Sequence, residues 1–181
     1  IMGGQIWLES EEGEGSTFHF TAKLQLGEDA ESAANDKTDV DAGKLLDTAV
    51  GLARRKIEQH QVSIETEYQQ GLPTFPGDPN QLRQVFSNLI VNGVQAMEQT
   101  PDEQRLLQVT VAVDFAPSGT AIRVNVCDRG AGLGDESEQK LFEPFYTTRA
   151  KGTGLGLAIV RQILERHSGS IRLLPRDGGG T

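Results

Sequence analysis

The sequence predicts an α+β protein. We expect a two-layer α/β sandwich, in which helices cover one face of a mixed, mostly antiparallel sheet. Two long segments, 40–59 and 78–98, repeat apolar residues at helical spacing. Short apolar runs of strand length alternate with the helical segments, and turn residues separate these runs. The chain has 181 residues and is 36% hydrophobic, which is enough for a core of ordinary size.

Three helices are expected, and each has its own sequence signal. The helix at 40–59 should bury Leu45, Ala49, Leu52 and Ile57. The helix at 78–98 begins with a capping aspartate and a proline at the first helical position, and Gln81 can close a capping box. Its apolar stripe consists of Leu82, Phe86, Leu89, Gly93 and Ala96. A third helix is expected over 153–167.

The expected strands are short runs that are rich in β-branched and aromatic residues. They span 17–24, 62–68, 106–115, 121–127 and 170–174. Pro117 and Gly119 mark a turn between the third and fourth of these strands. Cys127, at the end of the fourth strand, is the one cysteine of the sequence and is expected to be a small core residue.

The composition excludes several classes of function. A net charge of −9 and a pI near 4.8 argue against a nucleic-acid partner, which requires a basic surface. The sequence contains no run of 18 apolar residues, so no membrane span is expected. The single cysteine argues against a disulfide within the chain, and a reducing, cytoplasmic location fits.

Asn88 and Asn92 form the first of four motifs. They lie four residues apart on the second expected helix, so they share one face of it. Mg²⁺ prefers hard oxygen ligands and few protein groups when phosphates are present, and a neutral carboxamide oxygen suits that role. Taken alone, the two asparagines would be ordinary polar residues on a solvated helix face.

Two glycine-rich motifs and a loop between them follow. Asp128 ends a strand and is followed by Gly130 and Gly132, which let the backbone approach a flat ligand closely. The segment 152–156 carries three glycines and leads into a helix, where free N–H groups can bind phosphate. The loop between them, 142–151, contains Phe142 and Phe145, both expected to anchor it by burial. The same loop contains Arg149 and Lys151, which are candidate cations for a phosphate or else surface charges.

The four motifs in this order resemble the ATP-binding catalytic domain of sensor histidine kinases. That domain belongs to the wider group with gyrase, the ninety-kilodalton heat-shock chaperones and the mismatch-repair ATPases. The resemblance covers 39–181, and 144–149 look most like the nitrogen-regulation subtype. It implies ATP and Mg²⁺ as cofactors. It also implies that Asn92 binds the metal with help from Asn88, and that Asp128 accepts a hydrogen bond from the adenine amino group.

The resemblance also implies a set of residues around the nucleotide. Asn88 and Arg149 are expected to be catalytic. The expected nucleotide contacts are Asn88, Asn92, Asp128, Gly130, Gly132, Phe145, Thr148, Arg149, Lys151, Gly152, Thr153, Gly154, Leu155 and Gly156. Two positions depart from the family pattern: Gly93, where alanine is usual, and Gln95, where many members have a basic residue.

The implied function is transfer of the γ-phosphoryl group of ATP to a histidine on a separate dimerisation domain, with a response regulator as the downstream partner. Related ATPases that use water carry glutamate where this chain has Asn88, so efficient hydrolysis is not expected. None of His19, His60 and His167 has the sequence context of a phosphate acceptor, so little autokinase activity is expected in isolation. The alternative is a non-catalytic nucleotide-binding or interaction module.

An internal repeat predicts the domain organisation. Segment 4–8 matches 169–173, and two glycines that follow 4–8 recur after 169–173 at the same offset. We therefore expect 1–26 to be the C-terminal β-hairpin of one kinase catalytic domain. We expect 27–38 to be a flexible acidic linker, and 39–181 to be a second domain that lacks its own last strand.

The strand at 17–24 is expected to fill the sheet edge beside 171–174. It could do so within the chain or from a neighbouring molecule, and the second arrangement would give a strand-exchanged homodimer. The alternative is a hairpin that packs loosely elsewhere.

Overall fold

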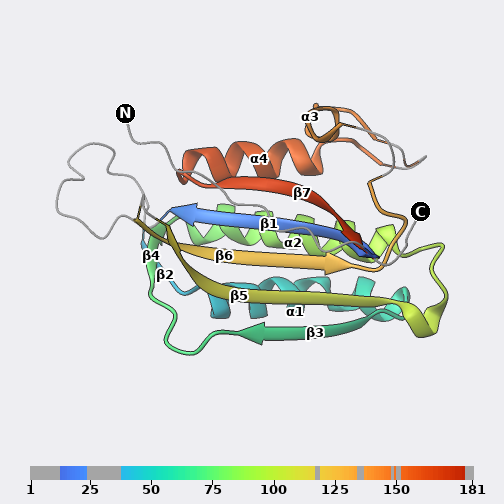
Figure 1. Cartoon of the computed structure of the whole chain (residues 1–181), viewed down its shortest axis with the longest axis horizontal. Coiled ribbons are helices and arrows are strands. Elements are labelled where there is room, and N and C mark those ends of the chain that lie inside the picture. Colours follow the sequence, from blue (N-terminus) through green and yellow to red (C-terminus); the bar gives the residue numbers. More distant parts are fainter. Residues whose placement is uncertain are drawn as a thin grey trace.

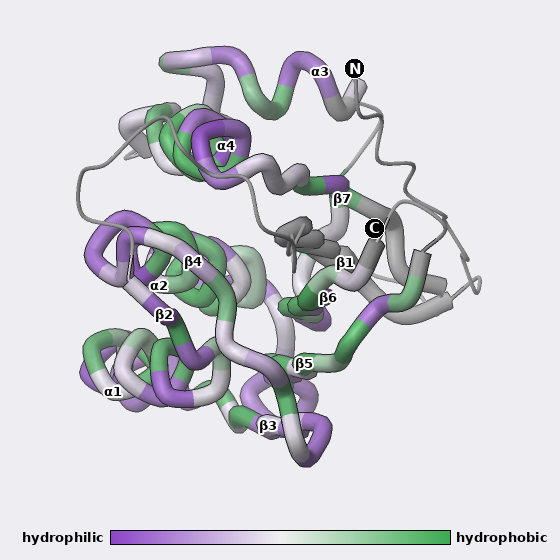
Figure 2. Tube along the Cα trace, turned by 90° about the vertical axis from the view of Figure 1, so that its left-hand side faces the viewer, coloured by the Kyte–Doolittle hydropathy of each residue, from purple (hydrophilic) through white to green (hydrophobic). Residues whose placement is uncertain are grey.

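Five strands form one sheet, and three long helices lie against one of its faces (Figures 1 and 2). The computed structural model describes residues 13–23, 38–116, 119–133, 137–147, 149 and 152–177. The helices are α1 (Ala42–Gln59), α2 (Pro79–Ala96) and α4 (Gly156–Arg166). The strands, in sheet order, are β3 (Ser63–Tyr68), β5 (Leu106–Ala116), β6 (Gly119–Asp128), β1 (Gly13–Lys23) and β7 (Ser170–Asp177). The predicted fold class is confirmed.

The sheet is mixed because β3 runs parallel to β5, whereas the other neighbouring pairs are antiparallel. A parallel pair needs a long connection, and here α2 lies in the chain between β3 and β5. Among the described residues, no helix is long and apolar enough to cross a bilayer.

Strand β1 is an interior strand of the sheet. Phe18 pairs with Val126 of β6 on one side and with Leu173 of β7 on the other, antiparallel in both cases. The strand therefore lies beside 171–174 in the same chain, and it is bonded to β6 as well. Residues 1–12 and 24–37 lie outside the described part, and with them most of the expected linker.

Small elements that the sequence analysis missed complete the fold. A two-stranded sheet pairs β2 (Thr38–Val40) with β4 (Phe75–Gly77), and a single 3₁₀ turn, η1 (Asp102–Gln104), precedes β5. The short helix α3 (Glu138–Leu141) lies in the loop that follows β6. The prediction of helix from residue 40 was wrong by two residues, because Val40 belongs to β2 and Asp41 caps α1.

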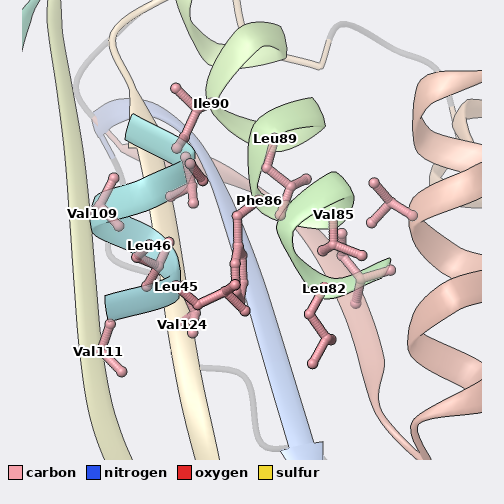
Figure 3. Packing of buried hydrophobic residues seen from close by; sticks show 14 of the residues in the cluster. Leu45, Leu46, Leu82, Val85, Phe86, Leu89, Ile90, Val109, Val111 and Val124 are labelled. Atoms are coloured by element: carbon pink, nitrogen blue, oxygen red, sulfur yellow. The ribbon is translucent and has the colours of Figure 1, made fainter. Parts of the chain in front are cut away.

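Most of the core comes from side chains of α1, α2, β5 and β6 (Figure 3), and α4 and β7 add to it. Phe86 of α2 is completely buried, and Leu46 of α1 and Val124 of β6 are buried with it. The predicted stripe of α2 is correct for Leu82, Phe86, Leu89 and Gly93, whereas Ala96 is half-buried. The predicted face of α1 is wrong at Leu52, which is 66% exposed. Ala53 is buried in that face instead.

The start of α2 is fixed by a carboxylate and by the histidine that caps the C-terminus of α4. Asp78 Oδ1 accepts from the N–H groups of Asn80 (2.8 Å) and Gln81 (3.2 Å), and Gln81 Nε2 donates to Asp78 Oδ2. The N–H of Asp78 donates to His167 Nε2 at 3.0 Å. The capping box predicted for Gln81 is therefore wrong in detail, since His167 accepts the hydrogen bond that Gln81 was expected to accept.

We expect Asp78→Ala to lower the free energy of unfolding by about 1–2 kcal/mol, because both backbone N–H groups lose their acceptor. Asp41 is the matched control. It caps α1 through the N–H of Lys44 and forms an exposed ion pair with Lys44 Nζ at 3.5 Å, which adds little, so Asp41→Ala should cost about 0.5–1 kcal/mol. Urea unfolding at neutral pH measures both values. An equal or larger loss for Asp41→Ala would contradict the assignment.

The same substitution gives a pH prediction. The hydrogen bond from the Gln81 N–H is the main cause that lowers the pKa of Asp78 below its ordinary value. A lowered folded-state pKa stabilises the protein above the unfolded pKa of about 4 and ceases to do so as pH falls through the folded value. The stability difference between the wild type and Asp78→Ala should therefore shrink in acid. A difference that grows below pH ~4 would contradict this prediction.

Candidate functional site

A cavity of about 420 Å³ lies where the second half of α2, the end of β6 and the segment 146–157 meet. A smaller cavity of about 310 Å³ lies against α4 and β7 and contains none of the predicted nucleotide contacts. The larger cavity brings together most of the predicted site. The predicted contacts that line it are Asn88, Asn92, Asp128, Gly132, Arg149, Gly152, Thr153, Gly154 and Gly156.

The remaining five predicted residues fall into two groups. Thr148 and Lys151 lie outside the described residues. Gly130, Phe145 and Leu155 lie within two positions of lining residues in the chain but do not line the cavity itself. Gly130 and Leu155 shape the backbone around it, as described below.

Helix α2 presents a polar face to the cavity and an apolar face to the core. Asn88, Asn92 and Gln95 recur at spacings of four and three, so they lie on one side of the helix, and all three line the cavity. The Asn92 carboxamide lies 3.8–4.0 Å from the position that a Cβ on Gly156 would occupy. The first turn of α4 therefore faces Asn92 across the cavity.

Asp128 ends β6 at the floor of the cavity and is only 1% exposed. Its Oδ1 accepts a hydrogen bond from the Gly130 N–H at 2.8 Å, which folds the turn back over the carboxylate. Gly130 packs on the end of α2, where an added Cβ would lie 2.6 Å from the carbonyl carbon and oxygen of Ala96. The Ala131 N–H donates to that same oxygen at 3.2 Å. Only glycine at position 130 permits this approach.

Gly93 lies on the opposite side of Asp128. A Cβ at position 93 would lie 3.5 Å from Asp128 Cβ and 2.6 Å from Leu107 Cδ1. The glycine thus lets α2 approach the Leu107 side chain of β5, the strand next to the one that carries Asp128. This contact gives a packing reason for the departure from alanine at position 93.

The segment 152–156 forms a glycine loop that ends at the first residue of α4. Gly154 has φ +65°, in the left-handed region, so the helix begins at Gly156 and not at Thr153 as predicted. Leu155 is the N-cap residue and provides no side-chain capping bond. The first N–H groups of α4 therefore have no side-chain acceptor from that residue, and Gly156 and Leu157 of this turn line the cavity.

Phe145 joins this loop to the segment before it, although not by burial. Its N–H donates to the carbonyl of Gly154 at 2.9 Å, and its backbone has φ +68°. This conformation leaves the Phe145 side chain 75% exposed, so its predicted anchoring by burial is wrong. Phe142 is buried, at 6% exposed, as predicted, and Arg161 lies over its ring at 5.7 Å.

Arg149 is half-buried and bonded to the end of α2. Its Nη1 donates to Gln95 Oε1 at 2.7 Å, and its Nη2 donates to the Asn92 carbonyl at 3.0 Å. Burial lowers the pKa of Arg149, while the negative charges of Glu98 and Asp128 partly offset this effect. The guanidinium is thus a cation held inside the cavity and not a solvated surface charge.

The structure adds lining residues that sequence reasoning did not select. Lys56, on the last turn of α1, lines the cavity beside the α2 face and carries a positive charge. The sequence around Lys56 does not predict that it lines this cavity, because only tertiary packing brings the end of α1 there. The other additional lining residues are Val91, Gln95, Ala96, Leu133, Leu141, Tyr146, Thr147 and Leu157.

Comparison with known proteins identifies what this arrangement is similar to. Residues 77–181 match the model of the family described as "Histidine kinase-, DNA gyrase B-, and HSP90-like ATPase". The sensor histidine kinase ZraS of Escherichia coli K12 is 31% identical over 142 residues, which cover 78% of this chain and 29% of ZraS. The C4-dicarboxylate transport sensor protein DctS of Rhodobacter capsulatus is 36% identical over 142 residues, 78% of this chain and 21% of DctS. The chain thus spans less than a third of either relative.

Solved structures give the same result at the level of fold. The catalytic domain of the histidine kinase ThkA is 25% identical with a TM-score of 0.62, over 78% of this chain and 97% of that domain. Full-length ShkA, solved in complex with AMPPNP, shares the fold with a TM-score of 0.62 at 23% identity, over 83% of this chain and 33% of ShkA.

Proposed function

Because the chain belongs to the histidine kinase-, DNA gyrase B- and HSP90-like ATPase family, we propose that it is the ATP-binding catalytic module of a sensor histidine kinase. One observation carries the proposal. Three motifs from distant parts of the chain converge on one cavity: Asn88 and Asn92, then Asp128, then the segment 152–156. A fourth motif, the loop that contains Phe145, is bonded to the third.

Each part of the cavity has a role in this function. Asp128 accepts a hydrogen bond from the adenine amino group, and the tight turn at Gly130 leaves room for the flat base. The glycine loop and the first N–H groups of α4 bind the phosphates, with the positive end of the helix dipole toward them. Arg149 offsets the negative charge that develops as the terminal phosphoryl group leaves.

The cavity also fits Mg²⁺ as a cofactor. Asn88 and Asn92 place two neutral carboxamides beside the phosphate end. The described residues contain no group of three or more His, Cys, Asp or Glu side chains that could hold a metal, so phosphate oxygens and waters must complete the coordination. When bound, the ion supplies positive charge to the phosphate oxygens. We propose Asn92 as its protein ligand, assisted by Asn88.

Removal of Mg²⁺ should therefore weaken ATP binding, and Asn92→Ala should reduce that metal effect roughly tenfold. The measurement is calorimetric titration with a non-hydrolysable ATP analogue, with and without EDTA. Asn80→Ala, on the first turn of the same helix and outside the cavity, is the control and should retain the full metal effect. Equal metal dependence in the wild type and in Asn92→Ala would remove Asn92 from the metal site.

The proposed reaction is in-line transfer of the γ-phosphoryl group to a histidine of a separate dimerisation domain, followed by transfer to a response regulator. Asn88 supports transfer over hydrolysis, because a neutral amide cannot take a proton from an attacking water as a carboxylate can. We place this activity in the cytoplasm.

The decisive experiment supplies the acceptor. The chain is incubated with Mg²⁺, γ-labelled ATP and the dimerisation domain of a similar sensor kinase, and label on histidine is measured. Transfer that depends on Asp128 supports the kinase assignment. Mg²⁺-dependent ATP binding without transfer to any supplied acceptor domain would instead favour a non-catalytic nucleotide-binding module.

We propose the domain organisation from the sequence repeat. Residues 1–26 are the terminal hairpin of another catalytic domain, 27–38 are a linker, and 39–181 form the nucleotide-binding domain, with 144–149 of the nitrogen-regulation type. Limited proteolysis should cut first within 27–38. Resistance of that segment would contradict its role as a linker.

We also propose that the position of β1 between β6 and β7 can be filled by β1 of a second copy, which would give a strand-exchanged homodimer. The pairing seen within the chain supports this, since the same antiparallel contacts can form between copies. Light scattering that reports only monomers at all concentrations would exclude it.

A further inference from the structure

Gln95 and Arg149 form a pair that joins the loop before the glycine segment to α2. Gln95 is half-buried in the last turn of the helix, and its Oε1 lies 2.7 Å from Arg149 Nη1. Asn92 contributes its carbonyl oxygen 3.0 Å from Nη2. The planar guanidinium is thus held at two of its nitrogens by two residues three positions apart on one helix face.

Both acceptors in this contact are neutral. An amide oxygen and a carbonyl oxygen orient the guanidinium without cancelling its charge, whereas a carboxylate would form an ion pair with it. A guanidinium carries five N–H donors, and these two contacts use one donor on each of two nitrogens, so other donors can bind an anion. A lysine at position 95 would repel Arg149 and could not accept from it.

The pair lies among the groups that suit a phosphate chain. Gln95 and Arg149 line the cavity together with Asn92 and the glycines at 152, 154 and 156. Asp128, the proposed adenine contact, lines the same cavity and is buried at its floor. Arg149 is thus a cation that lines the same cavity as the glycine segment, and a triphosphate has a terminal phosphate that a diphosphate lacks.

We propose that Gln95 is a positioning residue that holds Arg149 toward the terminal phosphate and thereby sets the preference of the site for ATP over ADP. The inference rests on the proposed nucleotide-binding function. It predicts that position 95 acts on ligand selectivity only through Arg149.

The test is a double-mutant cycle on the full chain, in which calorimetry gives the ratio of the ADP to the ATP dissociation constant in Mg²⁺. Arg149→Gln should lower this ratio roughly ten- to a hundredfold, and Gln95→Leu about two- to tenfold. In the Arg149→Gln background, Gln95→Leu should cause no further change. Gln84→Leu, on the exposed side of the same helix and outside the cavity, is the matched control and should leave the ratio unchanged.

Gln95→Glu separates positioning from a merely structural contact. The carboxylate keeps the hydrogen bond to Arg149, so the melting temperature should not fall. The new ion pair cancels the charge that the phosphate needs, so the ATP preference should fall as in Gln95→Leu. Glutamate is close in size to glutamine, so this variant remains informative if the leucine variant folds poorly.

Two outcomes overturn the inference. If the wild type binds ATP but Gln95→Leu weakens ATP and ADP equally, or adds its full effect to Arg149→Gln, the positioning role is wrong while the proposed function stands. If the wild type binds neither nucleotide in Mg²⁺, the proposed function and the positioning role both fail.

Discussion

Asp128→Asn should weaken the binding of an ATP analogue roughly ten- to a hundredfold. The carboxylate is 1% exposed, so a hydrogen bond to its charge is not diluted by competing water. An asparagine of nearly the same shape keeps an oxygen that accepts from the Gly130 N–H, but it loses the negative charge. Its NH₂ group and the adenine amino group are both donors, so they cannot form a hydrogen bond with each other. Calorimetric titration in Mg²⁺ measures the effect.

Asp39→Asn is the matched control for this experiment. It makes the same chemical change on an exposed residue of β2 that does not line the cavity, so binding should be unchanged. Thermal melts of both variants separate lost binding from lost folding. Wild-type affinity in a folded Asp128→Asn protein would mean that this carboxylate does not contact the base.

Gly154→Ala should abolish measurable nucleotide binding. The position has φ +65°, and an added Cβ would lie 2.3 Å from the carbonyl carbon of Phe145 and 2.6 Å from its Cα, which are backbone atoms that cannot rotate away. The hydrogen bond between the Phe145 N–H and the Gly154 carbonyl must then break, and the glycine loop must move away from the start of α4. The same titration measures the loss.

Gly71→Ala is a close control. It introduces the backbone strain of a positive φ without a steric clash between the new Cβ and neighbouring atoms. Gly71 has a similar φ of +71°, but an added Cβ meets nothing within 4 Å, and the residue does not line the cavity. This variant should lose about 1 kcal/mol of stability and bind nucleotide normally. Equal binding by Gly154→Ala and Gly71→Ala would contradict a role of the 154 turn in holding the ligand.

Local sequence patterns were sufficient for the parts of the site that depend on helix and strand periodicity. The four-residue spacing of Asn88 and Asn92 placed both on one face of α2, and the position of Asp128 after an apolar run placed it at the end of a strand. Both follow from fixed geometry within one element.

The failures have a common physical origin in contacts between distant segments. Phe145 has a left-handed backbone, a bond to Gly154 and an exposed side chain, so its aromatic character wrongly suggested burial. The Leu52 position fits helical spacing, but α1 packs through Ala53. The contact of Arg149 with Gln95 joins residues 54 positions apart, and no periodicity encodes it.

The position of β1 has a consequence for how the chain folds. An interior strand of the sheet comes from near the start of the chain, and Phe18 is bonded between Val126 and Leu173. Such pairings close long loops, and the entropy cost of closure precedes the favourable contacts, which favours slow folding. During synthesis β1 can pair with β6 once β6 emerges, and the other edge of β1 then stays open until β7 emerges. Refolding rate, more than final stability, should therefore be the property most sensitive to substitutions in residues 13–23.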